Sequence, residues 1–431
     1  MAQPHVPGAQ PGAGMTGRCD RLALLLCAAM AMAPAMGGEL RGSWQSYWLA
    51  HSAAQAGPLA QAHALLPAIA AAPASSGVTL AQVQGSAVWG GLQWHADVVA
   101  QAERPEGGPG HSQATVMESY AAGTLGNWQW SLGHKVVGWD VGYGFRPNDV
   151  VQQEVRRLLV AVPLQGRPVL MAERYTPDAA WSLVAVNPTT ERSATGAREP
   201  ALAARWYQRL GAADAYAFAR WGQRTRGSLG AAFAWVVSDA LELHGSLRHM
   251  AHFDTWEDTS AAPAALALAS PWRTTTAGAA QQALLGGTWT NAQQVSVLLE
   301  AWYDGTAPSA GQWRQWAQRG EALQRMAAAG APPAAVAGNL AWQAQVFNAF
   351  ASLRRQNLLL RCSWTAGAWE PALDMLYHPE DGGALLTASL AWKGDRWRWE
   401  GGLRASAGPA AAVVRQLPVQ RQAYVQAVWS F

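Results

Sequence analysis

The sequence of 431 residues contains few charged side chains. Asp, Glu, Lys and Arg together make up 14% of it, whereas soluble domains contain about 25%. Lysine is especially rare, because Lys135 and Lys393 are its only occurrences, and the net charge is +3. Proteins that bind nucleic acid carry a much larger basic excess. The composition therefore predicts no nucleic-acid partner.

Cysteine is also scarce, and its positions exclude two kinds of stabilisation. Cys19 and Cys27 lie in an N-terminal segment that we expect to be removed, which leaves Cys362 alone in the mature chain. A single cysteine can form neither an intramolecular disulfide nor a cysteine-based metal cluster. Leucines precede Cys27, where a lipid-modified cysteine is expected to follow a small residue, so a lipid anchor is not predicted.

The N-terminal segment has the organisation of a secretory signal. A basic start at Arg18 and Arg21 precedes an apolar core over residues 22–33 and a small-residue cleavage site ending at Ala35. The apolar core is shorter than the roughly 20 residues of a membrane-spanning helix. We predict a signal peptide over residues 1–35, with Met15 as an alternative start.

The rest of the chain lacks any run of 18 apolar residues, and strict alternation takes its place. Residues 92–99, 241–248 and 396–404 alternate apolar with polar side chains. Successive side chains of a strand point to opposite faces, so each segment has one apolar and one polar face. We expect about eighteen strands, with 16–18 as the range, at residues 40–48, 79–88, 92–101, 115–123, 127–138, 169–175, 180–187, 200–209, 214–223, 228–238, 241–250, 281–290, 293–303, 342–353, 357–365, 383–392, 396–404 and 419–431.

The expected connections alternate between tight turns and longer segments. The tight turns are expected at 89–91, 124–126, 177–178, 211–213, 239–240, 291–292, 354–356 and 393–395. The long loops are expected at 49–78, 139–168, 251–280 and 304–341. Short periplasmic turns and long extracellular loops are typical of outer-membrane barrels, whereas a β-sandwich does not sort its loops in this way. The prediction is an all-β transmembrane antiparallel β-barrel over residues 36–431.

The last strand supports this prediction. Residues 421–431 place Ala423, Val425, Ala427, Trp429 and Phe431 on one face. A terminal aromatic residue on such a strand resembles the signal that bacterial barrels present to the β-barrel assembly machinery. Many tryptophans also lie near strand ends on apolar faces, as an interfacial girdle requires. We expect the outer membrane of a Gram-negative bacterium as the location, with its lipid and the assembly machinery, through Phe431, as partners.

Motifs of soluble enzymes are missing or out of context. Gly142 and Gly144 are not followed by the glycine of a dinucleotide-binding fingerprint, and the chain has neither a P-loop nor a Gly-x-Ser-x-Gly elbow. His249 and His252 have no third metal ligand at a diagnostic spacing. We therefore predict no enzymatic activity, no catalytic residues, no metal and no cofactor.

The polar faces of the expected strands carry arginine more often than acid. The inward arginine candidates are Arg205, Arg209, Arg220, Arg248, Arg361, Arg396, Arg398 and Arg404, and the acidic candidates are Asp97, Asp214, Glu242, Glu300 and Glu400. An arginine excess in a pore favours anions. Alternatively, arginines and acids pair and stiffen the wall. The sequence leaves both interpretations open.

Two short segments indicate a family. The segment 133–149, with Lys135, Trp139, Pro147 and Asp149, and the segment 299–305 resemble elements of porin-like outer-membrane barrels of the alginate-export type and their uncharacterised proteobacterial relatives. The resemblance implies a barrel of about eighteen strands that passes or exports a solute, in alginate-type relatives an anionic polysaccharide. Asp140 and Arg146 depart from the family pattern and leave the cargo open.

The glycine-rich segment after Trp139 is then expected to bend away from the wall and act as a gatekeeping loop. Its constriction candidates are Arg146, Asp149, Arg156 and Arg157. The leading hypothesis is a channel with an arginine-lined lumen, whose periplasmic or inner-membrane export partners are unknown. Alternatives are a plugged barrel that acts as a receptor, adhesin or assembly scaffold, and a barrel enzyme, for which the sequence offers no catalytic set.

Overall fold

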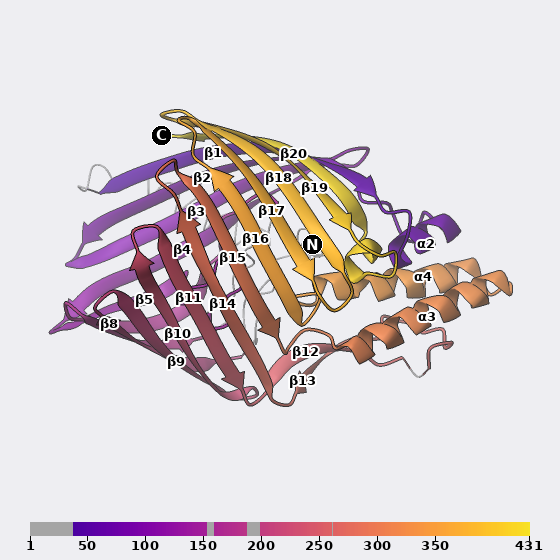
Figure 1. The fold of residues 1–431 in the computed structure, drawn as a ribbon, viewed down its shortest axis with the longest axis horizontal. Helices are drawn as coiled ribbons and strands as arrows, with labels where there is room; N and C mark the ends of the chain where they lie inside the picture. The colour runs from indigo at the N-terminus through magenta and orange to yellow at the C-terminus, as the bar shows by residue number, and fades with distance from the viewer. Residues whose placement is uncertain (1–37, 153–158, 188–198, 261) are drawn as a thin grey trace.

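A computed structural model describes residues 38–152, 159–187, 199–260 and 262–431, and it shows a closed β-barrel (Figure 1). Eighteen strands form one sheet in which consecutive barrel strands pair antiparallel, and β1 pairs with β20 to close it. The predicted fold class is confirmed. The predicted signal peptide, residues 1–35, lies outside the described residues.

The barrel strands are β1 (Glu39–Ala53), β2 (Ser76–Trp89), β3 (Leu92–Pro105), β4 (His111–Leu125), β5 (Trp128–Lys135), β6 (Arg167–Tyr175), β7 (Ala179–Val186), β8 (Ala201–Leu210), β9 (Ala213–Gly222), β10 (Arg226–Ser238), β11 (Leu241–Met250), β14 (Ala280–Thr290), β15 (Val295–Asp304), β16 (Gln356–Trp364), β17 (Trp369–His378), β18 (Gly383–Lys393), β19 (Trp397–Ala407) and β20 (Val419–Ser430). A separate hairpin, β12 (Phe253–Asp258) and β13 (Trp272–Ala277), lies between β11 and β14.

Short turns collect at one end of the barrel, where β1 begins and β20 ends. Gly90 and Gly91 join β2 to β3 with φ angles of 62° and 76°, which is the left-handed backbone that a two-residue hairpin turn requires. Gly126 (φ 59°) and Gly211 (φ 67°) serve the next turns of this kind. By the rule for outer-membrane barrels, this end is periplasmic and the opposite end is extracellular.

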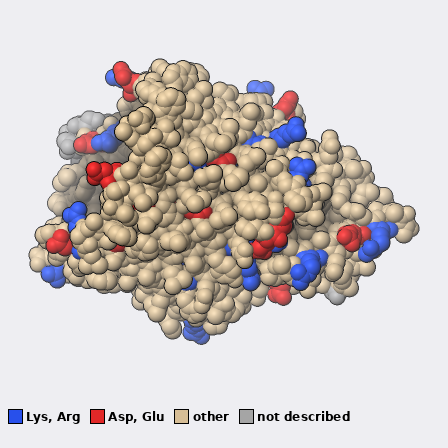
Figure 2. Space-filling view, viewed as in Figure 1, with Lys and Arg blue, Asp and Glu red and all other residues tan. Residues whose placement is uncertain are grey.

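The outer wall is apolar. Leu229, Leu202 and Leu403 point away from the lumen and are 69%, 64% and 64% exposed. With the many other exposed leucines and tryptophans they form a continuous apolar surface, as a lipid environment favours. Figure 2 shows that most of one face of the molecule carries no charged side chain. Exposed tryptophans gather near the periplasmic ends of the strands, among them Trp89 and Trp397, as expected for an aromatic girdle.

Two errors in the predicted strands cancel in the strand count. Residues 342–353 are not a strand, because they continue α4 (Pro333–Gln343) into the 3₁₀ helix η3 (Ala344–Asn348). Residues 354–356 are consequently no periplasmic turn, and the turn lies instead at residues 365–368. The strand β17 was missed, and it contains Pro371, a residue that argues against an interior strand because it lacks an N–H donor.

The extracellular segments contain helices as well as loops. The helix α2 (Pro58–Leu65) lies between β1 and β2, and α3 (Ala310–Ala328) and α4 lie between β15 and β16. Ser309 and Gln312 form a capping box that begins α3. Leu323, Val336 and Leu340 are fully buried between these helices. The helices project from the extracellular end (Figure 1).

Candidate functional site: the lumen and its inserted loop

The segment between β5 and β6 folds into the lumen. It begins after Lys135 and ends before Arg167, and we call its described residues, 136–152 and 159–166, the lumen loop. Trp139, Asp140, Asn148 and Asp149 are between 0% and 6% exposed, although surface loops normally leave polar residues in water. Their burial requires partners from the barrel wall.

Glu300 is the first of these partners. It lies on the inward face of β15, nearly opposite β5 in the strand order, and it is fully buried. Its carboxylate accepts the backbone N–H groups of Tyr143 and Gly144, both at 2.6 Å, and lies 2.9 Å from His244 Nε2. A Cβ atom at Gly144 would lie 2.6 Å from Leu359 and 3.0 Å from Glu300 Oε2. Only glycine therefore allows the backbone to approach the carboxylate so closely.

Ser246 on β11 provides a second anchor. Its hydroxyl donates to the Asp140 carboxylate at 2.8 Å and accepts from Asn148 Nδ2 at 2.7 Å. The Asn148 backbone N–H donates to the same carboxylate at 2.5 Å. The Asp140 carboxylate thus joins both ends of residues 140–148 to one strand of the wall.

Asp149 holds the fold of the loop itself. Its carboxylate accepts the backbone N–H groups of Trp139 at 2.8 Å and Asp140 at 3.1 Å, and Arg146 Nε lies 3.4 Å away. Burial raises the pKa of Asp149 to about 6, although the Arg146 charge and the two N–H donors oppose the shift. Burial also raises the pKa of Asp140. Both carboxyl groups therefore favour protonation more than an exposed aspartate does.

Apolar contacts attach the lumen loop to the wall on three sides. On the first side, the loop residues Val137, Trp139, Val150 and Val151 pack against Val169, Val184 and Phe218. On the second side, Phe145 packs against Leu284, Leu298, Trp302 and Leu359. On the third side, Leu159 and Val160 pack against Tyr47, Leu49 and Tyr424. In strand order these three walls surround the lumen. The loop therefore crosses the lumen instead of lining one side of it.

Arg205 and Arg248 are two of the predicted pore-lining arginines that contact this loop. The Arg205 guanidinium lies 5.6 Å from the centre of the Trp139 ring. Arg248 donates to the Pro147 carbonyl at 3.0 Å and to Ser228 Oγ at 3.1 Å. These contacts support the loop from β8 and β11.

Other predicted arginines pair with acids on neighbouring strands. Arg361 contacts Asp374 at 2.8 Å. Arg398 contacts Glu400 at 2.8 Å and Glu370 at 3.3 Å. Glu370 and Asp374 both belong to β17, so the strand that the sequence pattern did not reveal supplies counter-charges to two predicted pore arginines.

The remaining predicted residues are distributed around the barrel. Arg220 bonds to Thr225 and lies 3.4 Å from Glu199, and Arg404 donates to Thr387. Arg209 faces Asp214 across the β8–β9 pair. Glu242 lies 3.7 Å from His244.

Three predicted arginines do not lie on described barrel strands or on the described part of the lumen loop. Arg396 is exposed in the turn before β19, outside the strands. Arg156 and Arg157 lie outside the described residues.

Several residues that position the loop were missed in the sequence. Tyr143, Asn148, His244 and Ser246 each contribute a bond to the loop anchors. The inward register of His244 and Ser246 follows from the alternation of residues 241–248, but no local pattern indicates that a loop from β5 meets them. Within the described residues, no cluster of His, Cys, Asp and Glu is suited to a metal ion. No helix there is long and apolar enough to span a membrane.

Comparison with known proteins identifies the fold. No protein-family model matches the sequence, and no curated protein matches it. Among solved structures, the chain is similar to Acinetobacter baumannii OccAB3, with 9% identity, a TM-score of 0.51 and coverage of 91% of this chain and 99% of that one. It is similar to OccAB1 of the same organism, with 9% identity, a TM-score of 0.50 and coverage of 92% and 96%.

A third similar structure is Pseudomonas aeruginosa OccK5 (OpdH), with 7% identity, a TM-score of 0.50 and coverage of 91% and 98%. At such identities the likeness concerns the fold. The chain has the fold of a porin-like bacterial outer-membrane β-barrel. This part of the predicted resemblance is confirmed.

Replacing Glu300 with alanine should loosen the lumen loop. The change removes the carboxylate that accepts hydrogen bonds from the Tyr143 and Gly144 N–H groups, and each hydrogen bond to a charged group contributes about 1.5–3 kcal/mol. We expect faster hydrogen exchange of residues 140–149 in detergent-solubilised protein, measured by mass spectrometry. Glu242→Ala is the matched control, because Glu242 is also inward but its side chain is 43% exposed. Unchanged exchange in Glu300→Ala would show that the carboxylate does not anchor the loop.

Asp149 should make the folded state more stable in mild acid. Its folded pKa of about 6 lies above the ordinary value of 3.8, so the folded state binds the proton more tightly, and stability falls as pH rises from about 4 to 6. The thermal midpoint should rise between pH 7.5 and pH 5, and Asp149→Asn should reduce this rise. Asp239→Asn, in an exposed turn, is the control. If the thermal midpoint of Asp149→Asn depends on pH as that of the wild type does, the Asp149 carboxyl group is not the cause of the rise.

Proposed function

We propose that this chain is an outer-membrane channel that passes small solutes, with the lumen loop as its constriction. The fold supports an outer-membrane channel, because the similar structures share this barrel over nearly the whole length of the chain. The main observation in favour of a constriction is the pair of hydrogen bonds from the Tyr143 and Gly144 N–H groups to Glu300. These bonds hold the loop against β15, which lies nearly opposite β5, the strand from which the loop starts.

The contacts of Arg361 support its role at this constriction. Its guanidinium lies 5.8 Å from the centre of the Tyr143 ring at the tip of the loop. The side chains of Arg361 and Asp374 retain 31% and 21% exposure, so both face space inside the barrel. A solute that passes the loop tip would meet this ion pair.

The charge pairs support weak charge selectivity more than a strong preference for anions. Arg361 and Arg398, two of the arginines expected to attract anions, contact three carboxylates. Opposite charges at such distances largely cancel each other's field for a passing ion. The anionic cargo and the direction of transport that the alginate-type resemblance implies stay predictions.

A plugged barrel that serves as a receptor, adhesin or assembly scaffold is the second candidate. The observation that favours it is the attachment of the lumen loop to three walls. The two candidates differ in one measurable property, the conductance of the intact protein in a planar bilayer.

Deletion of residues 142–157 should increase single-channel conductance severalfold. The deletion removes the loop tip that meets β15 and β16, and ion flow rises with the open cross-section. The control shortens residues 106–110, an exposed connection between β3 and β4, and should leave conductance unchanged. If only the deletion variant conducts ions, the result would support the plugged barrel. If neither the intact protein nor the deletion variant conducts ions, the channel proposal would be refuted.

Substitutions in the ion pair at the constriction should shift selectivity in opposite directions. Arg361→Gln leaves Asp374 uncompensated and should move the reversal potential in a salt gradient toward cations. Asp374→Asn should move it toward anions. Arg396→Gln, in the exposed periplasmic turn, should have little effect. If both substitutions leave the reversal potential unchanged, this pair does not lie on the ion path.

A further inference from the structure

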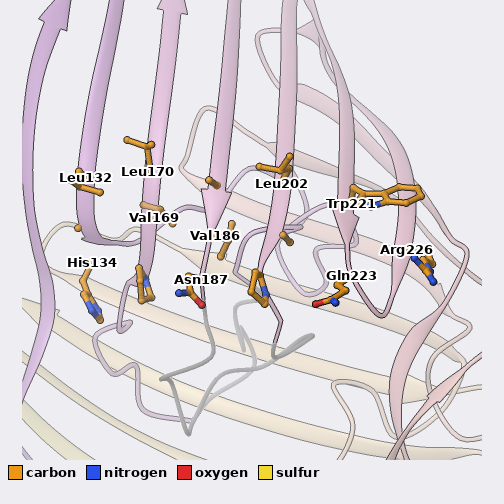
Figure 3. A pocket seen from close by; sticks show the side chains of 15 residues that line it. Leu132, His134, Val169, Leu170, Val186, Asn187, Leu202, Trp221, Gln223 and Arg226 are labelled. Carbon is orange, nitrogen blue, oxygen red and sulfur yellow. The ribbon is translucent and has the colours of Figure 1, made fainter.

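A pocket of about 710 Å³ lies on the outer wall at the extracellular ends of β5 to β10 (Figure 3). Its apolar lining includes Leu132, Leu170, Leu202 and Trp221, which point away from the lumen and are 56%, 52%, 64% and 58% exposed. Valines on the inward face below them pack against the lumen loop. The exposed leucines and Trp221 open the pocket to the membrane side of the wall, while Val169 and Val186 of the inward face form its floor.

The pocket is layered from apolar to polar. Figure 3 shows Leu132, Leu170, Leu202 and Trp221 at one level of the strands, and His134, Asn187, Gln223 and Arg226 nearer the strand ends. A tryptophan at this boundary is typical of a membrane–water interface. A ligand that contacts both the leucines and the polar side chains near the strand ends must be an amphiphile, with its apolar part toward the membrane interior.

The wall is low at this place. β5 and β7 have 8 residues and β6 has 9, whereas β1 to β4 have 14 or 15. A strand needs about 9–11 residues to cross the hydrocarbon core. The ends of β5 to β7 therefore lie near the headgroups of the outer leaflet, and that leaflet is the source of the occupant.

Arg226 gives the pocket its charge. Within the described residues it has no hydrogen bond or ion pair from its side chain, unlike the neighbouring Arg224, which contacts Asp254 at 2.5 Å. Its backbone φ of 57° is left-handed, one of two such values at described residues other than glycine. This backbone closes the three-residue turn between β9 and β10 and fixes the direction in which Arg226 leaves the strand. An uncompensated guanidinium at a headgroup level favours phosphate.

We propose that this pocket binds one phosphorylated, multiply acylated lipid of the outer leaflet. Its acyl chains lie against Leu132, Leu170 and Leu202, and a phosphate accepts hydrogen bonds from Arg226. The site is separate from the lumen and does not depend on the barrel being a channel.

Native mass spectrometry of the detergent-solubilised full-length protein tests this proposal, with bisphosphorylated lipid A as the probe. The wild-type protein should retain one lipid A molecule, and Arg226→Gln should weaken its binding roughly tenfold, the effect of losing a charge-assisted hydrogen bond. Leu202→Gln should also weaken it, because it places an amide among the acyl chains. A diacylglycerol, which carries no phosphate, should bind without this dependence on Arg226.

Arg174→Gln is the matched control. Arg174 also faces outward beside a tryptophan, 5.9 Å from the Trp181 ring centre, but at the periplasmic end of β6. The Arg174→Gln protein should bind lipid A as tightly as the wild-type protein. Retention of lipid A by Arg226→Gln equal to that of the wild type would overturn the proposal, as would an equal loss in Arg174→Gln. Heat-dependent gel migration verifies that each variant is a folded barrel.

Discussion

The carboxylate of Glu300 is the constraint on which the interior of this barrel depends. A fully buried carboxylate is costly unless donors surround it, and here the donors are two backbone N–H groups of the lumen loop and the ring of His244. The loop begins on a strand nearly opposite, so the bonds can form only if the chain crosses the lumen. Glu300 and the loop thus require each other. Without the loop, the carboxylate would face open water, and without the carboxylate the loop would lose two backbone hydrogen bonds to the wall.

The same compensation governs the other charges of the lumen. Arg361, Arg398 and Lys393 lie against acids of β17, while Arg248 and Arg205 contact the loop through a carbonyl and a ring. Arginine serves here as a partner for carboxylates, carbonyls and aromatic faces, for which its planar geometry is suited. A count of arginines on inward faces therefore overestimates the field that a solute meets, because much of that charge is neutralised locally.

The sequence predicts the wall far better than the interior. Alternation with period two identifies a strand and its faces without reference to any other strand, so most strands of the eighteen-stranded wall could be located from the sequence alone. It fails where composition misleads, as at Pro371 in β17 and at residues 344–348, whose alternation belongs to a helical segment. The anchors are a different matter. Glu300 meets Gly144 across 156 positions of sequence, and only the closed barrel brings them together.

The inward course of the lumen loop also explains the unevenness of the outer wall. The chain leaves β5 at Lys135 and returns to the wall at Arg167, so β5 and β6 are both short at their extracellular ends. The next strands, β7 to β9, are also short, with 8 to 10 residues. Inside, Val137 and Trp139 cover the apolar faces of these strands and keep them dry. Outside, the low rim brings the leucines of β5, β6 and β8 beneath polar strand ends. One diversion of the chain therefore constricts the lumen and shapes the pocket on the membrane face behind it.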